Sequence, residues 1–370
     1  MKRMWNVAAL GAVIVIGLGT FAVDATEPKA EWALDISSNP SVWEDAVVGV
    51  SYSTENDIEQ RFEVTTDESH ITSNLNYIAE GLRYRERLNE GERAIHRQMN
   101  GMTYAESIRT EDGYIGVGQD GMKELIMFKQ EDGEKLSTFS FDASDSKIYD
   151  IVNGVWSGVF LNDGQLNLIY RDGYDGGEDV KTMLATFNQA MNEVTVKELS
   201  MDKGFITHVI NTNRLYNTDV PSQVTETRYI PVGVSSYEVI REGEEEINVE
   251  NPNPGLFAYD TKTGKVVQLA EDQGYWDYTV SDHNLFALNE DGEEVVIDLN
   301  TGKQMTRKIL DSVDDAFYAN GRLYQTRQAK DGIVIDVYED GKQISSAAIT
   351  PENEDARDML KQINVYVRQK

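Results

Sequence analysis

The sequence predicts an all-β fold in which about seven four-stranded sheets, with six as the alternative, form a single ring behind an N-terminal hydrophobic helix. Three observations predict it. Near copies of one strand-turn-strand segment recur, their spacing is about 40 residues, and a second pair of strands precedes several of the copies. Because each such unit covers its apolar faces only against its neighbours, we expect the series to close on itself.

The first element is an apolar, uncharged run at residues 7–23 that follows Lys2 and Arg3. A run of this kind directs export, and its length lies between that of a signal peptide and that of the shortest membrane-spanning helix. We expect a retained single-pass membrane anchor with its positive end inside the cell. The alternative is a signal peptide that is cleaved near Ala25, which would release a secreted protein.

The remaining boundaries follow from composition. Residues 1–25 are the signal or anchor segment, 26–42 are rich in Pro and Ser and predict a linker, and 43–370 form the folded domain outside the cytoplasm. The chain has 40% hydrophobic and 26% charged residues, as a folded domain requires. The formal charge of -30 repels phosphate backbones, so nucleic acid is not an expected partner. With no cysteine, disulfides, thiolate metal sites and cysteine nucleophiles are excluded.

The clearest repeat is FAYDTKTGKVVQL at 257–269, which is followed by VVIDLNTGKQMTRKI at 295–309. Both segments read as a strand, a turn closed by glycine, and a second strand, which is the pattern of a β-hairpin. Their turn glycines, Gly264 and Gly302, are 38 residues apart, and Gly341 of IDVYEDGKQISSAAI follows 39 residues later. The repeat therefore predicts the same hairpin in three successive units.

Four earlier hairpin turns are predicted near residues 56, 91, 133 and 192. Two gaps between hairpins are longer than the others, and they contain RDGYDGGEDV at 171–180 and REGEEEINVENPNPG at 241–255, which we interpret as insertions. An alternative division into two smaller β domains would place the boundary within 235–255.

Further strand pairs, such as DHNLFALNEDGEEVVIDL, precede the hairpins and complete four-stranded units. Residues 43–370 thus resemble a bacterial cell-envelope β-propeller of the WD-repeat or quinoprotein-like kind. The resemblance implies a fold and no activity, and the WD dipeptide at Trp276 lies in another part of the repeat. We expect a short helix near 352–361, followed by a strand from Ile363 that pairs with AVVGVSY at 46–52 and closes the fold.

Two glycine motifs are interpreted as turns. GVGQDG has the G-x-G-x-x-G spacing of a dinucleotide-binding loop, but a strand follows it where that loop requires a helix. The TGK sequences lack the upstream glycine of a phosphate-binding loop.

A calcium site is the one cofactor that the sequence suggests. The acidic insertion could fold four carboxylates around one ion, although a solvated acidic loop is the competing interpretation. These carboxylates belong to Asp172, Asp175, Glu178 and Asp179. The four histidines are scattered without metal-ligand spacing, and no other cofactor is expected.

Aromatic residues in QGYWDYTV are the candidate ligand-binding residues. Tyr275, Trp276 and Tyr278 could stack on a sugar or a peptide, or they could pack between neighbouring units. A second candidate is RYRER, in which Arg83, Arg85 and Arg87 share a strand face. These arginines would pair with glutamates or face an anionic partner such as lipid headgroups.

The sequence as a whole predicts a membrane-tethered, extracytoplasmic binding or scaffold module for a protein or a cell-wall polymer, rather than an enzyme, and no catalytic residue is singled out. Binding would occur through loops on one face. The alternatives are a polysaccharide hydrolase or lyase that works at the channel of the propeller, and a sensor accessory to an envelope transporter or signalling system.

Overall fold

The computed structural model describes residues 30–369 except positions 45, 54–58, 67, 73–89, 132–133, 173–179, 202–203, 211–221, 224, 243–244, 253 and 320. The predicted anchor at 7–23 and the three arginines of RYRER lie outside the described residues. The chain divides into two compact units. The smaller contains the described parts of Met1–Tyr84 with Tyr324–Tyr338 and Gln343–Lys370, and the larger contains those of Arg85–Leu323 with Glu339–Lys342.

The smaller unit contains the two ends of the described chain, and each end adds a strand to a sheet. The last strand pairs antiparallel with an early one, from Ala46 opposite Gln369 to Tyr52 opposite Ile363. The predicted closing pair is thereby confirmed. The strands of this sheet are, in order, β27 (Ile363–Gln369), β2 (Ala46–Ser53), β3 (Glu59–Val64) and β4 (Ser69–Ile71).

The second sheet of this unit begins with a strand that the sequence analysis assigned to a linker. β1 alternates apolar and polar residues, and Trp32 and Leu34 are buried where it pairs with β26. Trp43 is fully buried and donates its indole N–H to Ser345 Oγ at 2.8 Å. The predicted linker at 26–42 is therefore wrong over its second half, because apolar alternation outweighs the Pro and Ser content. The neighbouring strands are β1 (Trp32–Ser38), β26 (Lys342–Pro351), β25 (Ile333–Glu339) and β24 (Arg322–Gln328).

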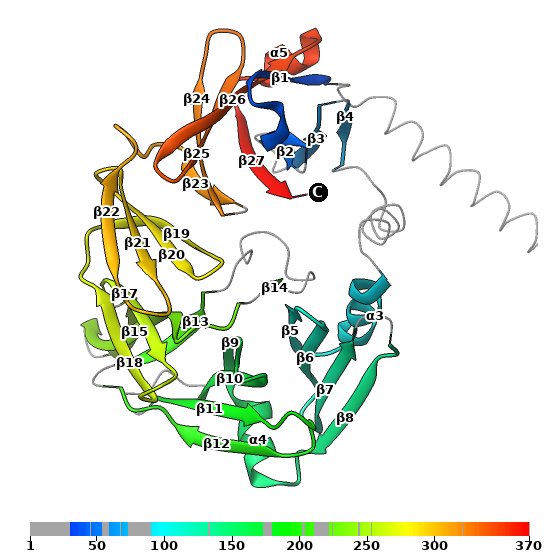
Figure 1. The fold of residues 1–370 in the computed structure, drawn as a ribbon, viewed down its shortest axis with the longest axis vertical. Coiled ribbons are helices and arrows are strands. Elements are labelled where there is room, and N and C mark those ends of the chain that lie inside the picture. Colours follow the sequence, from blue (N-terminus) through cyan, green and yellow to red (C-terminus); the bar gives the residue numbers. More distant parts are fainter. Residues whose placement is uncertain are drawn as a thin grey trace, which may run out of the picture. The chain divides into compact units, whose positions relative to one another are not determined.

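The larger unit contains four sheets that follow one another along the chain, coloured from cyan to yellow in Figure 1. The first contains β5 (Tyr104–Thr110), β6 (Gly113–Asp120), β7 (Glu124–Glu131) and β8 (Ser137–Asp142), with β14 (Ser222–Gln223) parallel to β5. The second contains β9 (Val155–Asn162), β10 (Gln165–Asp172), β11 (Lys181–Phe187) and β12 (Val194–Glu198).

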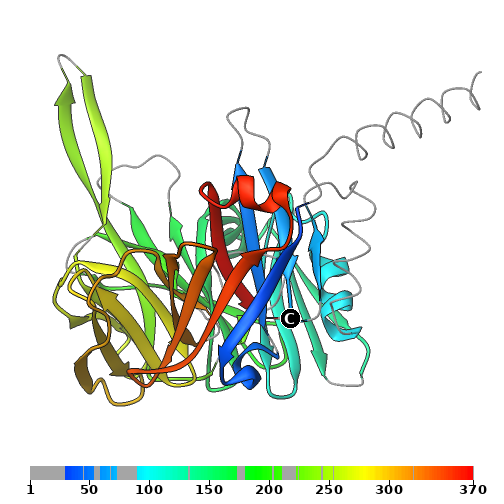
Figure 2. The ribbon, with the colours of Figure 1, turned by 90° about the horizontal axis from the view of Figure 1, so that it is seen from above.

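The third and fourth sheets contain the two near-identical hairpins. The third contains β13 (Phe205–Val209), β15 (Tyr229–Glu242), β17 (Leu256–Asp260) and β18 (Lys265–Ala270), with β16 (Glu245–Pro252) paired to the far half of β15. The fourth contains β19 (Tyr275–Ser281), β20 (Asn284–Asn289), β21 (Glu293–Asp298) and β22 (Gln304–Lys308), and β23 (Ala316–Ala319) follows it in the chain. The alternative boundary within 235–255 is wrong, because β15 pairs with β13 before it and with β17 after it in one sheet. The paired strands β15 and β16 stand out in Figure 2.

The described residues thus form six sheets, the smaller of the two predicted numbers. The hairpin predicted around Gly91 is wrong. Its second half is the helix α3 (Glu90–Met99), in which Ile95 is fully buried against Tyr114 and Phe128. Glu, Arg, Gln, Ala and Met dominate this segment, and these residues favour a helix over a strand. Two short α-helices, α4 (Ser146–Asn153) and the predicted α5 (Glu354–Met359), and the 3-10 helix η1 (Pro40–Trp43) complete the secondary structure of the described chain.

The core of the larger unit lies between consecutive sheets. Leu125 and Met127 of β7 pack with Leu168 of β10 in one cluster, and Phe160 of β9 packs with Ile230 of β15 in the next. Each sheet therefore buries apolar side chains against its neighbour in the chain, as the sequence predicts.

The repeated TGK sequence closes the turn between the last two strands of its sheet. Gly264 and Gly302 have φ values of 70° and 72°, and Gly341 has 73° at the turn between β25 and β26. Such positive values favour glycine. Similarly, Gly121 has a φ of 58° between β6 and β7, so GVGQDG ends a strand at a hairpin turn, as predicted.

Candidate ligand-binding face at the edge strand β19

β19 is the edge strand of the fourth sheet and carries all three of the predicted aromatic ligand residues. Its pairing with β20 is interrupted by a bulge between Tyr275 and Asp277. A bulge redirects the side chain of the extra residue, which here is Trp276. Trp276 is 56% exposed as a residue, yet its Nε1 donates a hydrogen bond of 3.0 Å to the carbonyl of Ala316. The result is an exposed aromatic plane that is held at one end.

The two tyrosines of β19 are more enclosed than the tryptophan. Tyr275 and Tyr278 both pack against the apolar cluster between the third and fourth sheets. The Tyr275 hydroxyl donates to the Glu271 carbonyl at 3.1 Å. Burial raises the pKa of Tyr278, and the charge of Asp277 raises it further. Its phenol therefore stays protonated at neutral pH and serves as a hydrogen-bond donor.

The partner of Tyr278 is a histidine on β13, the edge strand of the neighbouring sheet. The Tyr278 hydroxyl lies 3.2 Å from His208 Nε2, and His208 Nδ1 lies 2.9 Å from Thr207 Oγ1. His208 thus bridges Tyr278 and Thr207, and which of its two ring nitrogens donates depends on its tautomer. The missing side chain of Gly233 leaves room for the imidazole ring of His208, because a Cβ at position 233 would lie 2.2 Å from His208 Cε1.

A carboxylate lies next to the exposed indole. Asp277 accepts the backbone N–H of Tyr318 at 2.7 Å through Oδ2 and that of Tyr278 at 2.8 Å through Oδ1. Burial raises the pKa of Asp277, and the two N–H donors partly oppose this rise. Asp277 therefore ties β23 to β19 and fixes the backbone around Trp276.

Behind this carboxylate lies a buried network that holds β23 in place. The Tyr318 hydroxyl donates to Glu294 Oε1 at 2.9 Å, and Arg307 Nε donates to Glu294 Oε2 at 2.7 Å. Burial and the charge of Glu294 raise the pKa of Tyr318 well above its usual value, so the phenol stays a donor. The indole of Trp276 is thus bonded to the strand segment at Ala316, which Tyr318 holds in place through hydrogen bonds to Asp277 and Glu294.

The structure brings the three predicted aromatics together with residues that the sequence did not single out as ligands. His208 is one of the four histidines that lack metal-ligand spacing in the sequence, and Asp277 belongs to the WD dipeptide that lies in another part of the repeat. No local pattern could identify the histidine, because the two hydrogen-bonded side chains are 70 positions apart. Tyr275, Trp276 and Tyr278 lie together on β19, and their role as ligand-binding residues stays a prediction.

The predicted calcium ligands are only partly described. Asp172 lies exposed at the end of β10, whereas Asp175, Glu178 and Asp179 lie outside the described residues. Burial and the charge of Asp172 together raise the pKa of Asp150. In the described part of the chain, no group of three or more histidine, aspartate and glutamate residues could hold a metal ion. The calcium site stays a prediction.

No model of a known protein family matches this chain, and no curated protein matches it. Among solved structures, TolB from Acinetobacter baumannii is 11% identical, with a TM-score of 0.34 over 88% of this chain and 67% of its own. Apo AztD from Citrobacter koseri is 10% identical, with a TM-score of 0.26 over 92% and 99%. The polysaccharide lyase Uly1 is 11% identical, with a TM-score of 0.31 over 68% and 58%. Similarities at this level carry no functional inference.

Across the described residues, no helix has the length and apolar character needed to span a bilayer.

Proposed function

We propose that this chain is a membrane-tethered, extracytoplasmic β-propeller that binds a protein or a cell-wall ligand through the face around Trp276, without catalysis. The observation that carries the proposal is a tryptophan that is more than half exposed and yet fixed by a hydrogen bond to Ala316. Exposed aromatic planes with a fixed orientation bind at low entropic cost, and tryptophan is enriched among the residues that dominate binding energy.

The packing between consecutive sheets and the pairing of the terminal strands support a single ring. Consecutive sheets of the larger unit bury apolar side chains against one another, and both ends of the described chain are held by strand pairing. A ring would place β13 and β19, the first strands of their sheets, at its centre. The ligand would then meet Trp276 at one mouth of the central channel.

The location is supported by the sequence alone. The apolar run at 7–23 follows two positive charges and precedes an acidic chain that contains no cysteine. A retained run of this kind would anchor the chain with the folded part outside the cytoplasm.

The β15–β16 ribbon is a second platform for a partner. Its strands pair from Ser235 opposite Pro252 to Glu242 opposite Glu245, whereas β15 pairs with β13 and β17 only within Tyr229–Ser235. The ribbon therefore extends past its own sheet, as Figure 2 shows. Projecting segments on a rigid scaffold commonly carry recognition.

The test is Trp276→Ala in the full chain. We expect the affinity for the protein or cell-wall fraction that the wild type binds to fall about 30-fold or more. Truncation of an aromatic side chain that dominates binding costs roughly 2 kcal/mol or more. The matched control is Met122→Ala, because Met122 is 73% exposed in the turn between β6 and β7. Equal affinity of the Trp276 variant and the wild type in equilibrium binding would refute the proposal.

One observation favours the lyase alternative, namely the hydrogen bond between Tyr278 and His208. A lyase requires a base for the proton beside the uronate carboxylate and an acid for the leaving oxygen. The raised pKa of Tyr278 makes its phenol a proton donor and a poor base, so a lyase would need His208 as the base. Depolymerisation of an acidic polysaccharide by the wild type, abolished in Tyr278→Phe, would establish this alternative in place of the binding module.

A further inference from the structure

A series of cationic side chains, here called the cationic strip, crosses the larger unit on the side of its hairpin turns. It begins on the outer strand of the second sheet, passes the turn of the third sheet and ends at the turn of the fourth. The strip consists of Lys197, Arg228, Lys262, Lys265 and Lys303. The lysines are exposed and Arg228 is half-buried.

The strip begins where β12 meets the β17–β18 turn. Lys197 Nζ lies 3.3 Å from the Tyr259 hydroxyl and 5.9 Å from the centre of its ring. A Cβ at Gly264 would lie 3.7 Å from this ammonium group, so the turn lies directly beside it. Lys262 and Lys265 belong to the same turn. Three lysines of two sheets therefore share this corner of the molecule.

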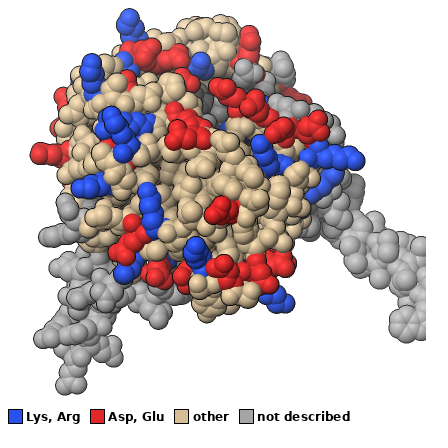
Figure 3. All heavy atoms as spheres, turned by 60° about the horizontal axis from the view of Figure 1, so that its bottom comes forward, with Lys and Arg blue, Asp and Glu red and all other residues tan. Residues whose placement is uncertain are grey.

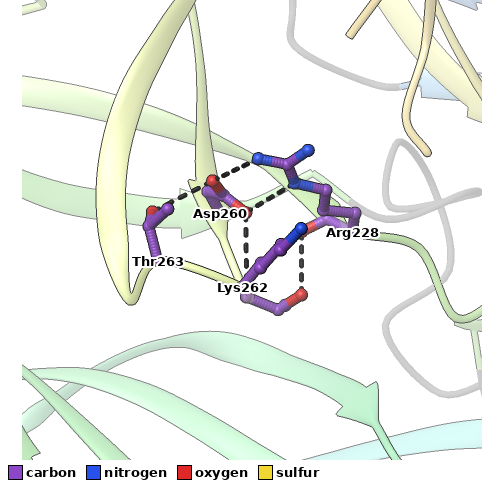
Figure 4. A network of polar contacts seen from close by, with 5 residues as sticks. Arg228, Asp260, Lys262 and Thr263 are labelled. Atoms are coloured by element: carbon purple, nitrogen blue, oxygen red, sulfur yellow. Dashed lines mark hydrogen bonds and ion pairs between the residues drawn. The ribbon is translucent and has the colours of Figure 1, made fainter. Parts of the chain in front are cut away.

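The buried carboxylate of Asp260 at this corner is already neutralised, as Figure 4 shows. Arg228 donates to both oxygens of Asp260 at 2.9 Å. Asp260 also accepts the Lys262 backbone N–H at 3.1 Å and the Thr263 hydroxyl at 3.0 Å. The Arg228 hydrogen bonds are the main cause that lowers the pKa of Asp260 to about 2. The negative charge of Asp260 is thus neutralised by Arg228 and does not neutralise the nearby lysines.

The strip continues to the fourth sheet through an aromatic ring. The Arg228 guanidinium lies 4.6 Å from the centre of the Tyr229 ring. A Cβ at Gly302 would lie 3.2 Å from Tyr229 Cε2, and the Tyr229 N–H donates to the Leu299 carbonyl at 2.8 Å. The next residue after Gly302 is Lys303. The two TGK turns are therefore joined into one surface.

The exposed ammonium groups of Lys262, Lys265 and Lys303 form no ion pair with any described residue. Among the described residues, Asp298 of the same turn as Lys303 and Glu198 next to Lys197 both have hydrogen-bond or ion-pair partners outside the strip. Asp298 accepts the backbone N–H groups of its own turn, which lowers its pKa, and Glu198 pairs with Lys181 at 3.1 Å. The strip thus brings these three unpaired lysines together in a chain whose formal charge is -30. Figure 3 shows one face on which groups of basic and acidic side chains occur side by side.

We propose that the cationic strip binds a chain-like polyanion whose phosphate or carboxylate groups repeat along its length. Charge complementarity supports the occupant, since an anion gains from unpaired cations that no internal carboxylate satisfies. The cations are spread over three consecutive sheets, so one small anion contacts few of them, whereas an extended polymer can contact them all. This surface lies at the hairpin turns and is separate from the β19 face of the proposed function.

The test measures binding of inorganic polyphosphate to the full chain over a range of salt concentrations. In K262Q/K265Q/K303Q we expect about tenfold weaker binding at low salt, and a slope of log K against log salt that is smaller by about 2, because each lost phosphate contact removes about 0.7. The matched control is K123Q/K135Q/K147Q, which changes the net charge equally at exposed lysines of other turns and of α4. This control should bind like the wild type. Denaturant unfolding confirms that both variants are folded.

Three outcomes would overturn the inference. Equal weakening in both triple variants would show a general charge effect. Monomeric phosphate that competes as well as polyphosphate at equal phosphate concentration would show a site for a single small anion. Binding to phosphatidylglycerol vesicles that depends on the three lysines, with no binding to polyphosphate, would show that the surface meets a membrane.

Discussion

At the scale of single residues, Asp260 gives the sharpest thermodynamic prediction. Its pKa in the folded chain is about 2, below the ordinary 3.8, so ionisation of this group stabilises the fold above about pH 4, and the stabilisation is lost as the pH falls through 2. Asp260→Asn should lower the free energy of unfolding by about 2 kcal/mol at neutral pH. Urea unfolding between pH 2 and 7 measures the difference from the wild type.

The control for Asp260 is Asp331→Asn, which changes an exposed aspartate. It should leave the free energy of unfolding nearly unchanged at every pH. A deficit of Asp260→Asn that stayed constant down to pH 2 would contradict the assignment of the low pKa.

Gly292 gives a steric prediction at the same scale. It lies between β20 and β21 with a φ of 75°, and a Cβ there would lie 2.2 Å from the backbone oxygen of Leu310. Gly292→Ala should cost more than about 3 kcal/mol, because a left-handed backbone and a clash with main chain add together. Gly121→Ala is the matched control, since its φ is 58° and nothing lies within 4 Å of its Cβ. We expect about 1 kcal/mol there, and equal losses in thermal unfolding would contradict the clash.

At the scale of elements, the strand β27 tests the closing pair. Val367 is buried where it lies opposite Val48, whereas Asn364 of the same strand is exposed. Val367→Asp should destabilise the chain by several kcal/mol, about 3 or more, because an unpaired carboxylate is buried. Asn364→Asp should stay within about 0.5 kcal/mol of the wild type. A Val367→Asp variant that unfolds at the wild-type temperature would show that β27 is not docked in this sheet.

Elements were predictable from the sequence where their signal is local. The two TGK hairpins follow from strand alternation and a glycine that must have positive φ, and both form as predicted. α3 was missed because Gly91 was interpreted as a turn glycine, although it lies in the first turn of a helix. β1 was missed because proline and serine suggested a linker, although Trp32 and Leu34 alternate in a strand.

The candidate site was predictable only in part, for the same reason. Trp276 and its two tyrosines are close in the sequence, so one aromatic segment revealed them. His208 and Tyr318 reach the same face from β13 and β23, and only the folded chain brings them to β19. The cationic strip was not predicted, because its lysines become neighbours only when three sheets pack together.

At the scale of the whole molecule, the near copies in the sequence have a physical reason. Each places a glycine turn at the end of a sheet, where it lies against a side chain of another strand. Gly264 lies beside Lys197, Gly302 beside Tyr229 and Gly341 beside Arg307. The repeated sequence therefore specifies a contact between a glycine turn and a side chain of another strand. The candidate ligand-binding residues lie outside the repeat. This is why the repeat predicts an architecture and does not predict a ligand.

The most direct test of the central claim replaces Trp276 with a photo-crosslinking amino acid in the full chain and irradiates intact cells. We predict one dominant adduct with a protein or a cell-wall polymer, and no such adduct when the same amino acid replaces Met122. Identical adducts at both positions, or none at position 276, would contradict a binding face at β19.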